Sequence, residues 1–268
     1  MRRIILICII SIAIVNVACP LLSDVISENM GDLESAAIET PQVATQVKYT
    51  RPHETIVYDV KMGELTVGEA VFDSTKTGQI NGKVVNVVTL DTSLATFRDT
   101  ETIYSDPDTF LPLKIERKIR SFIVEENIVE TYDQNNYVLT IARLNGTAKK
   151  EETIKKDGVI HNAILLPYQA RRERNLDLGW SLLVDLPNKK FQIELVSIEE
   201  VKVPAGTFNA YHFKSMPNLF EVWLTADERR VPVKIKGMDS VGYTLVMRKE
   251  ALEAPPSPQE PLTISNLK

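Results

Sequence analysis

The sequence predicts an all-β protein, mainly an antiparallel sheet curved into a half-barrel or open barrel, with one short helix. Three observations predict it: segments of period-two alternation, turn dipeptides between them, and one segment of helical spacing. The chain has 268 residues, of which 44% are hydrophobic and 25% charged. This composition is ordinary for a globular protein, and the length is sufficient to bury a sizeable core.

Apolar side chains recur at every second position in several segments. Apart from Arg117 the recurring residues are apolar: Ile56, Tyr58, Val60 and Met62; Leu113, Ile115, Arg117 and Ile119; Phe191, Ile193 and Leu195; Val231, Val233 and Ile235; and Val241, Tyr243, Leu245 and Met247. Successive side chains of a strand point to opposite faces, so each segment has one dry and one wet face. This pattern is typical of an antiparallel sheet with one solvated side.

Turn signals separate these segments. They are Asn81-Gly82, Asn145-Gly146, Asp157-Gly158 and Pro204-Ala-Gly206. Asn-Gly and Asp-Gly tolerate the positive φ that tight hairpins need, and the spacing predicts about a dozen short strands.

One segment has helical spacing instead. Ile160, Ile164, Leu165 and Tyr168 recur at three- to four-residue intervals, and Pro167 fits the first turn of a helix. We expect a short helix from about Pro167 that packs against the sheet and separates strands in 55–155 from strands in 178–248.

The N-terminus resembles an export signal. Arg2 and Arg3 precede a short apolar segment, and Asn16-Val17-Ala18-Cys19 resembles a bacterial lipoprotein box. We expect residues 1–18 to be a signal peptide and Cys19 to be lipidated, which would anchor the protein to a membrane. Plain secretion and an uncleaved anchor are the alternatives.

The rest of the chain divides into three parts. Residues 19–51 read as a tether, 52–250 as the antiparallel β domain, and 251–268 as a proline-rich, disordered tail. Cys8 and Cys19 are the two cysteines of the sequence. The β domain therefore contains no disulfide, cysteine metal site or thiol nucleophile.

Four motifs appear together in the β domain. They are Val67-Gly-Glu-Ala-Val-Phe72, Leu166-Pro-Tyr-Gln-Ala-Arg171, Val203-Pro-Ala-Gly-Thr-Phe208 and the run from Val222 to Val233. In this order and spacing they resemble the bacterial family called domain of unknown function 3108, over residues 52–248. The resemblance implies an exported, largely antiparallel β protein without an established activity. It also implies a build similar to the half-barrels of periplasmic lipoprotein carriers, which hold acyl chains on a concave face.

The motif residues have two interpretations. Gly68, Pro204, Gly206, Phe208 and Pro232 fit hairpin construction, because proline presets a turn and glycine supplies a conformation that other residues resist. The functional alternative is a rim around a ligand groove. Candidate contacts for a ligand or a partner protein are Tyr168, Arg171, Arg172, Trp223, Arg229 and Arg230. For the basic cluster of Arg171, Arg172 and Arg174, the simpler interpretation is a solvated helix face paired with Glu173 and Asp177.

The sequence contains no recognisable set of catalytic or metal-binding residues. His53, His161 and His212 are far apart in the chain, and there is no Gly-x-Ser-x-Gly elbow and no glycine-rich phosphate loop. We therefore predict no metal and no cofactor. The formal net charge of −5 makes nucleic-acid binding a poor expectation.

Three functions remain as hypotheses. The first is a non-enzymatic lipoprotein of the bacterial cell envelope, facing the periplasm, which binds a lipid or another apolar ligand on its concave sheet. This hypothesis predicts an apolar cavity of roughly 300–1,000 Å³. The second is a structural or adaptor protein that binds another envelope protein. The third is a cryptic hydrolase, which predicts facing carboxylates or a Ser–His pair in a cleft.

Overall fold

The computed structural model describes residues 53–123, 125–146, 148–173, 175–237, 242–252 and 262–263. The predicted signal peptide, Cys19 and the predicted tether lie outside these residues, as does most of the predicted tail. Within the described part of the chain, no helix is both long and apolar enough to cross a membrane.

The first half of the fold is a set of eight strands. They are β1 (Glu54–Met62), β2 (Leu65–Ile80), β3 (Lys83–Leu94), β4 (Phe97–Ser105), β5 (Pro112–Ser121), β6 (Glu125–Asp133), β7 (Val138–Asn145) and β8 (Ala148–Lys155). A 3-10 turn, η1 (Ala163–Leu165), and a helix, α1 (Leu166–Arg172), follow. The second half comprises β9 (Ser181–Asp185), β10 (Lys190–Val203), β11 (Gly206–Met216), β12 (Phe220–Thr225), β13 (Pro232–Gly237) and β14 (Thr244–Leu252). Strand β15 (Leu262–Thr263) pairs in parallel with β2.

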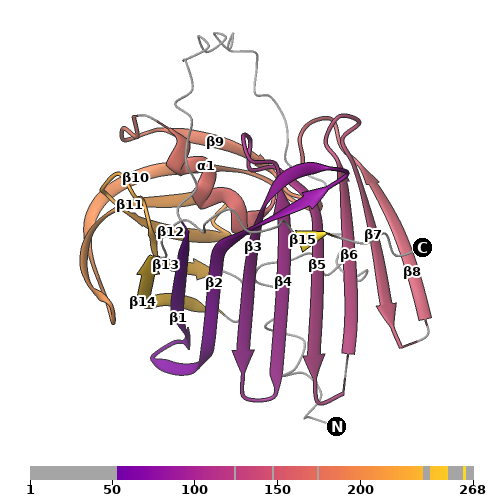
Figure 1. Cartoon of the computed structure of the whole chain (residues 1–268). Helices are drawn as coiled ribbons and strands as arrows, with labels where there is room; N and C mark the ends of the chain where they lie inside the picture. The colour runs from indigo at the N-terminus through magenta and orange to yellow at the C-terminus, as the bar shows by residue number, and fades with distance from the viewer. Residues whose placement is uncertain are drawn as a thin grey trace, which may run out of the picture.

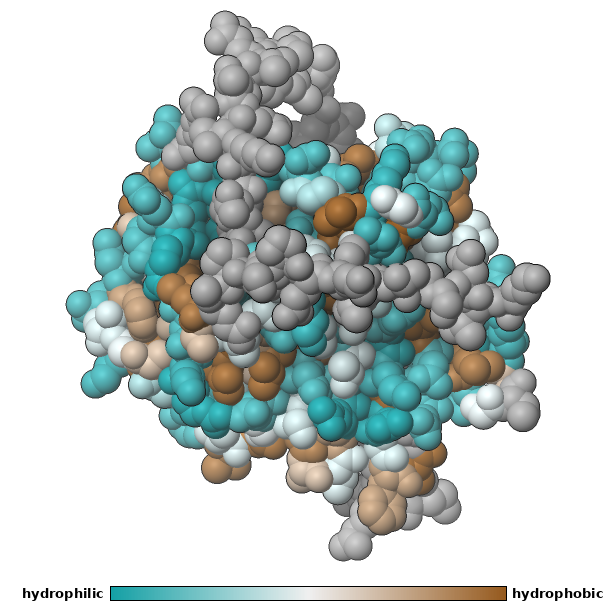
Figure 2. Space-filling model, in the orientation of Figure 1, coloured by the Kyte–Doolittle hydropathy of each residue, from teal (hydrophilic) through white to brown (hydrophobic). Residues whose placement is uncertain are grey.

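The strands form one curved, open sheet (Figure 1). Its order is β8-β7-β6-β5-β4-β3-β2-β1-β14-β13-β12-β11-β10-β9, and every neighbouring pair in this path is antiparallel. Two meanders are thus joined through the β1–β14 pair, while β8 and β9 are the two edges. The predicted fold class, an unclosed antiparallel sheet with one short helix, is confirmed. Hydrophilic residues cover much of the side seen in Figure 2, between separate hydrophobic patches.

The turn signals act where positive φ is needed. Asn81 and Gly82 connect β2 to β3 with φ values of 50° and 75°, and Gly146 lies between β7 and β8 at 57°. Gly206, with φ of 144°, begins β11. The expectation for Asp157-Gly158 was wrong, because this dipeptide follows β8 on the way to η1 and connects no paired strands.

The predicted helix packs between the two curved halves of the sheet (Figure 1). Pro167 occupies its first turn, where the missing N–H costs no hydrogen bond. The Tyr168 ring stacks on Phe72 and Phe110, with ring centroids 5.8 and 5.2 Å apart. Tyr168 and Leu165 are fully buried in the main hydrophobic core. The helix therefore covers part of the concave side of the sheet.

A buried ion pair fixes this helix to the sheet. Arg171 Nη1 donates to Glu54 Oε1 at 2.5 Å, and each side chain is only 1% exposed. Arg171 Nε donates to the Arg230 carbonyl at 3.1 Å. Burial raises the pKa of Glu54, and the guanidinium of Arg171 opposes that rise. One side chain thus joins α1, the start of β1 and the β12–β13 connection.

We expect Arg171→Met to lower the free energy of unfolding by about 3–5 kcal/mol, because it leaves the Glu54 carboxylate buried without its partner. The double variant with Glu54→Gln should recover much of this loss, since no uncompensated charge remains. Urea denaturation of both variants measures the difference. Arg120→Met is the control, because its pair with Glu125 lies on the surface. A loss no larger than that of the control would contradict the prediction.

Candidate functional site

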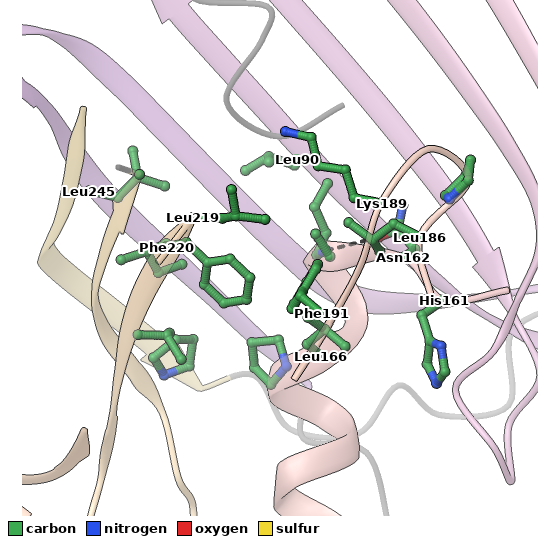
Figure 3. Close-up of a pocket in the computed structure, with 18 of the residues that line it drawn as sticks. Leu90, His161, Asn162, Leu166, Leu186, Lys189, Phe191, Leu219, Phe220 and Leu245 are labelled. Carbon is green, nitrogen blue, oxygen red and sulfur yellow. Dashed lines mark hydrogen bonds between the residues drawn. The ribbon is translucent and has the colours of Figure 1, made fainter. Parts of the chain in front are cut away.

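A cavity of about 250 Å³ lies between the two halves of the sheet (Figure 3). Most of its lining is apolar and comes from the second half of the chain, from η1 and α1, and from β2 and β3. The apolar lining includes Phe72, Leu90, Ile164, Leu166, Phe191, Leu219, Phe220, Val222, Ile235 and Leu245. An apolar cavity on the concave side was predicted, but its volume is slightly below the expected range because the helix fills part of the concavity.

One wall of the cavity is polar. We call Glu130, Tyr132, His161 and Asn162 the polar wall. The Tyr132 hydroxyl donates to Glu130 Oε2 at 2.5 Å. Burial raises the pKa of Glu130, and the hydrogen bond from Tyr132 opposes the rise. Both side chains come from alternate positions of β6 and therefore share its inner face.

The other two residues of the polar wall precede the helix. His161 Nδ1 accepts from the backbone N–H of Asp185 at 3.2 Å, which leaves the ring proton on Nε2. Burial lowers the pKa of His161, so its ring is neutral at pH 7. Asn162 Oδ1 caps η1 by accepting from the Ile164 N–H at 2.8 Å. The polar wall thus places the neutral side chains of Tyr132, His161 and Asn162 beside the buried carboxyl group of Glu130.

A charged network lies next to the polar wall on the inner face of β4 and β5. Arg117 Nη2 donates to Asp99 Oδ2 at 2.5 Å, and Arg117 Nε lies 4.0 Å from Glu101 Oε2. Burial raises the pKa of Glu101 to about 8, with Arg117 and Asn162 opposing and Glu130 adding to the rise. Among the described residues, Glu101 Oε1 and Arg117 Nη1 are buried without a hydrogen-bond partner.

Three of the predicted contact residues come together, but in the core. Tyr168 and Arg171 stack face to cation, with the guanidinium 5.0 Å from the ring centroid. Arg230 donates to the carbonyls of Ala170, at 2.6 Å, and Glu173. None of the three lines the cavity. Arg171 is also not on a solvated helix face, because its carboxylate partner is Glu54.

The other three predicted contact residues are dispersed. Arg172 is the half-buried last residue of α1. Arg229 lies at the surface, where it donates to Glu250 at 2.9 Å. Trp223 is buried and donates to Glu199 at 2.7 Å. None of them lines the cavity either.

The motif residues mostly build hairpins and close packing. A side chain at Gly68 would collide with Ser93 and Leu94 of the adjacent strand. Pro204 and Gly206 form the β10–β11 turn, and Phe208 packs against the main core. Pro232 alone among these five residues lines the cavity, and its carbonyl accepts from the Tyr58 hydroxyl at 2.7 Å.

A Ser–His–Glu arrangement lies across β10, β11 and β12. Ser197 Oγ is 3.3 Å from His212 Nδ1, and His212 Nε2 is 2.8 Å from Glu221 Oε2. The His212 ring stacks on Trp223 with centroids 4.1 Å apart. Glu221 and Trp223 alternate with the cavity-lining Phe220 and Val222, so the arrangement occupies the opposite face of the sheet. Ser197 also donates to Glu199 at 3.2 Å.

The described residues contain no group of three or more His, Cys, Asp or Glu side chains able to hold a metal ion. Sequence reasoning missed the polar wall and its charged network. A signal was present, because Arg117 and Glu130 occupy the inward positions of strands whose other inward residues are apolar, such as Ile115 and Ile128. A charge in the dry phase of an alternating strand marks a buried polar site.

We expect the stability of the Glu101→Gln variant relative to that of the natural protein to increase as the pH rises from 5 to 8. The folded protein holds this proton up to a pKa of about 8, whereas the unfolded chain releases it near 4.5. The stability that the raised pKa provides is therefore fully present below pH 4.5 and is lost toward pH 8.

Denaturation in urea at several pH values measures this effect. Each unit of pKa shift corresponds to about 1.4 kcal/mol, so the difference between the two proteins should grow by a few kcal/mol. Glu152→Gln on the exposed strand β8 is the control. A Glu101→Gln difference that stays constant with pH would refute the assignment.

Comparison with known proteins gives a family match and two structural likenesses. A crystal structure of a beta-barrel-like protein of domain of unknown function DUF1849 from Brucella abortus has 5% sequence identity and a TM-score of 0.48, covering 76% of this chain and 98% of that one. A structure from Bacteroides fragilis, whose description proposes export and a YmcC-like fold, has 9% identity and a TM-score of 0.27, covering 75% and 96%. No curated protein matches the chain.

The family model described as protein of unknown function (DUF3108) matches residues 57–248. This range begins in β1 and ends in β14, so it contains both meanders, the helix and the cavity. The resemblance that the four motifs indicated is confirmed, and the chain belongs to the DUF3108 family.

Proposed function

We propose that this protein is a non-enzymatic lipoprotein of the bacterial cell envelope that binds a single apolar chain in the cavity between its two half-sheets. The observation that carries the proposal is the cavity itself: most of its lining is apolar, and its polar groups include the polar wall and Asn188 and Lys189 of the β9–β10 connection. Ligand sites in proteins have this composition, with polar groups that fix the orientation of the ligand.

The volume of the cavity restricts the ligand. At about 250 Å³ it lies just below the usual range of roughly 300–1,000 Å³ for small-molecule sites. A phospholipid with two long acyl chains needs more space than this. The cavity therefore favours one short chain or one end of a longer chain, held against Phe191, Val222 and Leu245.

Attachment to a membrane belongs to the same proposal. Residues 19–51 extend at most about 3.3–3.6 Å per residue, so an anchor at Cys19 would let the β domain work up to about 110 Å from the membrane. A carrier or receptor for apolar molecules would gain from such reach.

A second candidate function is supported by the open sheet. The two edge strands differ: β8 is exposed and rich in Lys and Glu, which discourages pairing, whereas β9 exposes Leu183. An envelope protein could add a strand to β9. The Ser197 arrangement supports a hydrolase less well, because it is not in the cavity and Ser197 is shared with Glu199.

Native mass spectrometry of protein purified without detergent tests the carrier proposal. We expect an adduct with the mass of a single-chain lipid, which solvent extraction removes. Val222→Phe should weaken binding by about tenfold or more, because the added ring occupies the cavity and overpacking costs 1–3 kcal/mol. Val129→Phe, on the exposed face of β6, is the matched control. Absence of any adduct, or equal occupancy in both variants, would contradict the carrier proposal and favour the hypothesis that the protein binds another envelope protein.

A Cys19→Ala variant tests the anchor. We expect the natural protein in the membrane fraction of a bacterial host and the variant in the soluble fraction, because an acyl anchor is the attachment that the sequence predicts. Fractionation with an antibody against the β domain measures the distribution. Retention of the variant in the membrane fraction would show that another feature holds the protein there.

A further inference from the structure

We propose that the ligand of this cavity ends in a hydrogen-bond donor, a hydroxyl or an amine, which faces Glu130, and that chains ending in a carboxylate are excluded. This inference rests on the proposed function and narrows it to a class of ligand. Its basis is the arrangement of donors, acceptors and charges on and next to the polar wall.

The carboxyl groups around Arg117 outnumber their basic partners. Asp99 and Glu101 lie within 2.5 and 4.0 Å of its guanidinium, and Glu130 also interacts with it. Arg143 is the second basic group that acts on Glu130. Glu101, Arg117 and Glu130 are each at most 5% exposed, so little solvent screens them. An anionic ligand end beside Glu130 would add a further acid to this poorly solvated region, whereas the ammonium group of Lys189, which also lines the cavity, belongs to the exposed β9–β10 connection.

The hydrogen-bonding groups point to the same choice. The Tyr132 hydroxyl is already engaged with Glu130, and the Asn162 side chain hydrogen-bonds to Glu101. The carboxyl group of Glu130 lines the cavity, and carboxyl oxygens accept hydrogen bonds, so this wall favours a ligand end that donates.

His161 supplies the polar wall with a ring N–H donor. His161 keeps its proton on Nε2, since Nδ1 accepts from Asp185. A hydroxyl can accept from such a donor while it donates to a carboxyl oxygen, whereas an ammonium can only donate. A hydroxyl end and an ammonium end can each donate to the Glu130 carboxyl group. With either end, the ligand chain lies against the apolar lining that includes Val222, Ile235 and Leu245.

The test uses three probes with the same ten-carbon chain: decylamine, 1-decanol and decanoate. Each is titrated into the purified protein at pH 7 by calorimetry, below its micelle concentration. We expect decylamine and 1-decanol to bind at least about tenfold more tightly than decanoate, the order of one charge-assisted hydrogen bond. This comparison uses the unaltered protein and so does not depend on the folding of a variant.

Glu130→Gln then locates the effect. In this variant decylamine should lose its advantage over decanoate, while 1-decanol should change by no more than about threefold, because the amide side chain still accepts a hydrogen bond. Glu125→Gln, at the exposed start of the same strand, is the control and should preserve the order of the probes.

The outcomes separate the two proposals. If none of the three probes binds, the proposed function itself fails. If decanoate binds as tightly as the other two, or if Glu130→Gln leaves the order unchanged, apolar binding stands and the inference about the donor end is overturned.

Discussion

The buried pair between Glu54 and Arg171 is the constraint on which the rest of the interior depends. An open sheet of this curvature leaves a concave face that something must cover, and here the covering element is the short segment of η1 and α1. A helix of seven residues has little stability of its own. Its position is set by contacts: the ion pair at one end, the stacked ring of Tyr168 in the middle, and Pro167 at the start.

The position of the helix in turn shapes the cavity. Ile164, Leu166 and Pro167 line the cavity from η1 and α1, and His161 and Asn162 reach it from the residues just before. The cavity is therefore the space that remains between the sheet and the segment formed by η1 and α1. Its polar wall combines residues from β6 with residues from this segment, so both must be in place before the site exists.

The fold could be predicted from the sequence because its determinants are local. Alternation in segments such as Ile56–Met62 and turn glycines such as Gly82 and Gly146 specify strands and hairpins residue by residue, and Pro167 marks the helix start. The site could not be predicted, because it combines residues far apart in the chain, such as Glu130 and Val222. The environment of Arg171 could not be predicted for the same reason. Its proximity to Glu173 in the sequence suggested a solvated helix face, but its partner Glu54 is 117 residues away.

The two edge strands of the sheet, β8 and β9, are consecutive in the chain, while β1 and β14 pair in the middle, with Glu54 opposite Leu252. If the chain were rejoined between these two residues and opened between β8 and β9, every strand would pair with its neighbour in sequence, from β9 through β14 to β1 and on to β8. The topology is thus a circular permutation of an uninterrupted meander. The two edges of the open sheet are where such a meander would begin and end, and in this protein the chain between these edge strands forms η1 and α1.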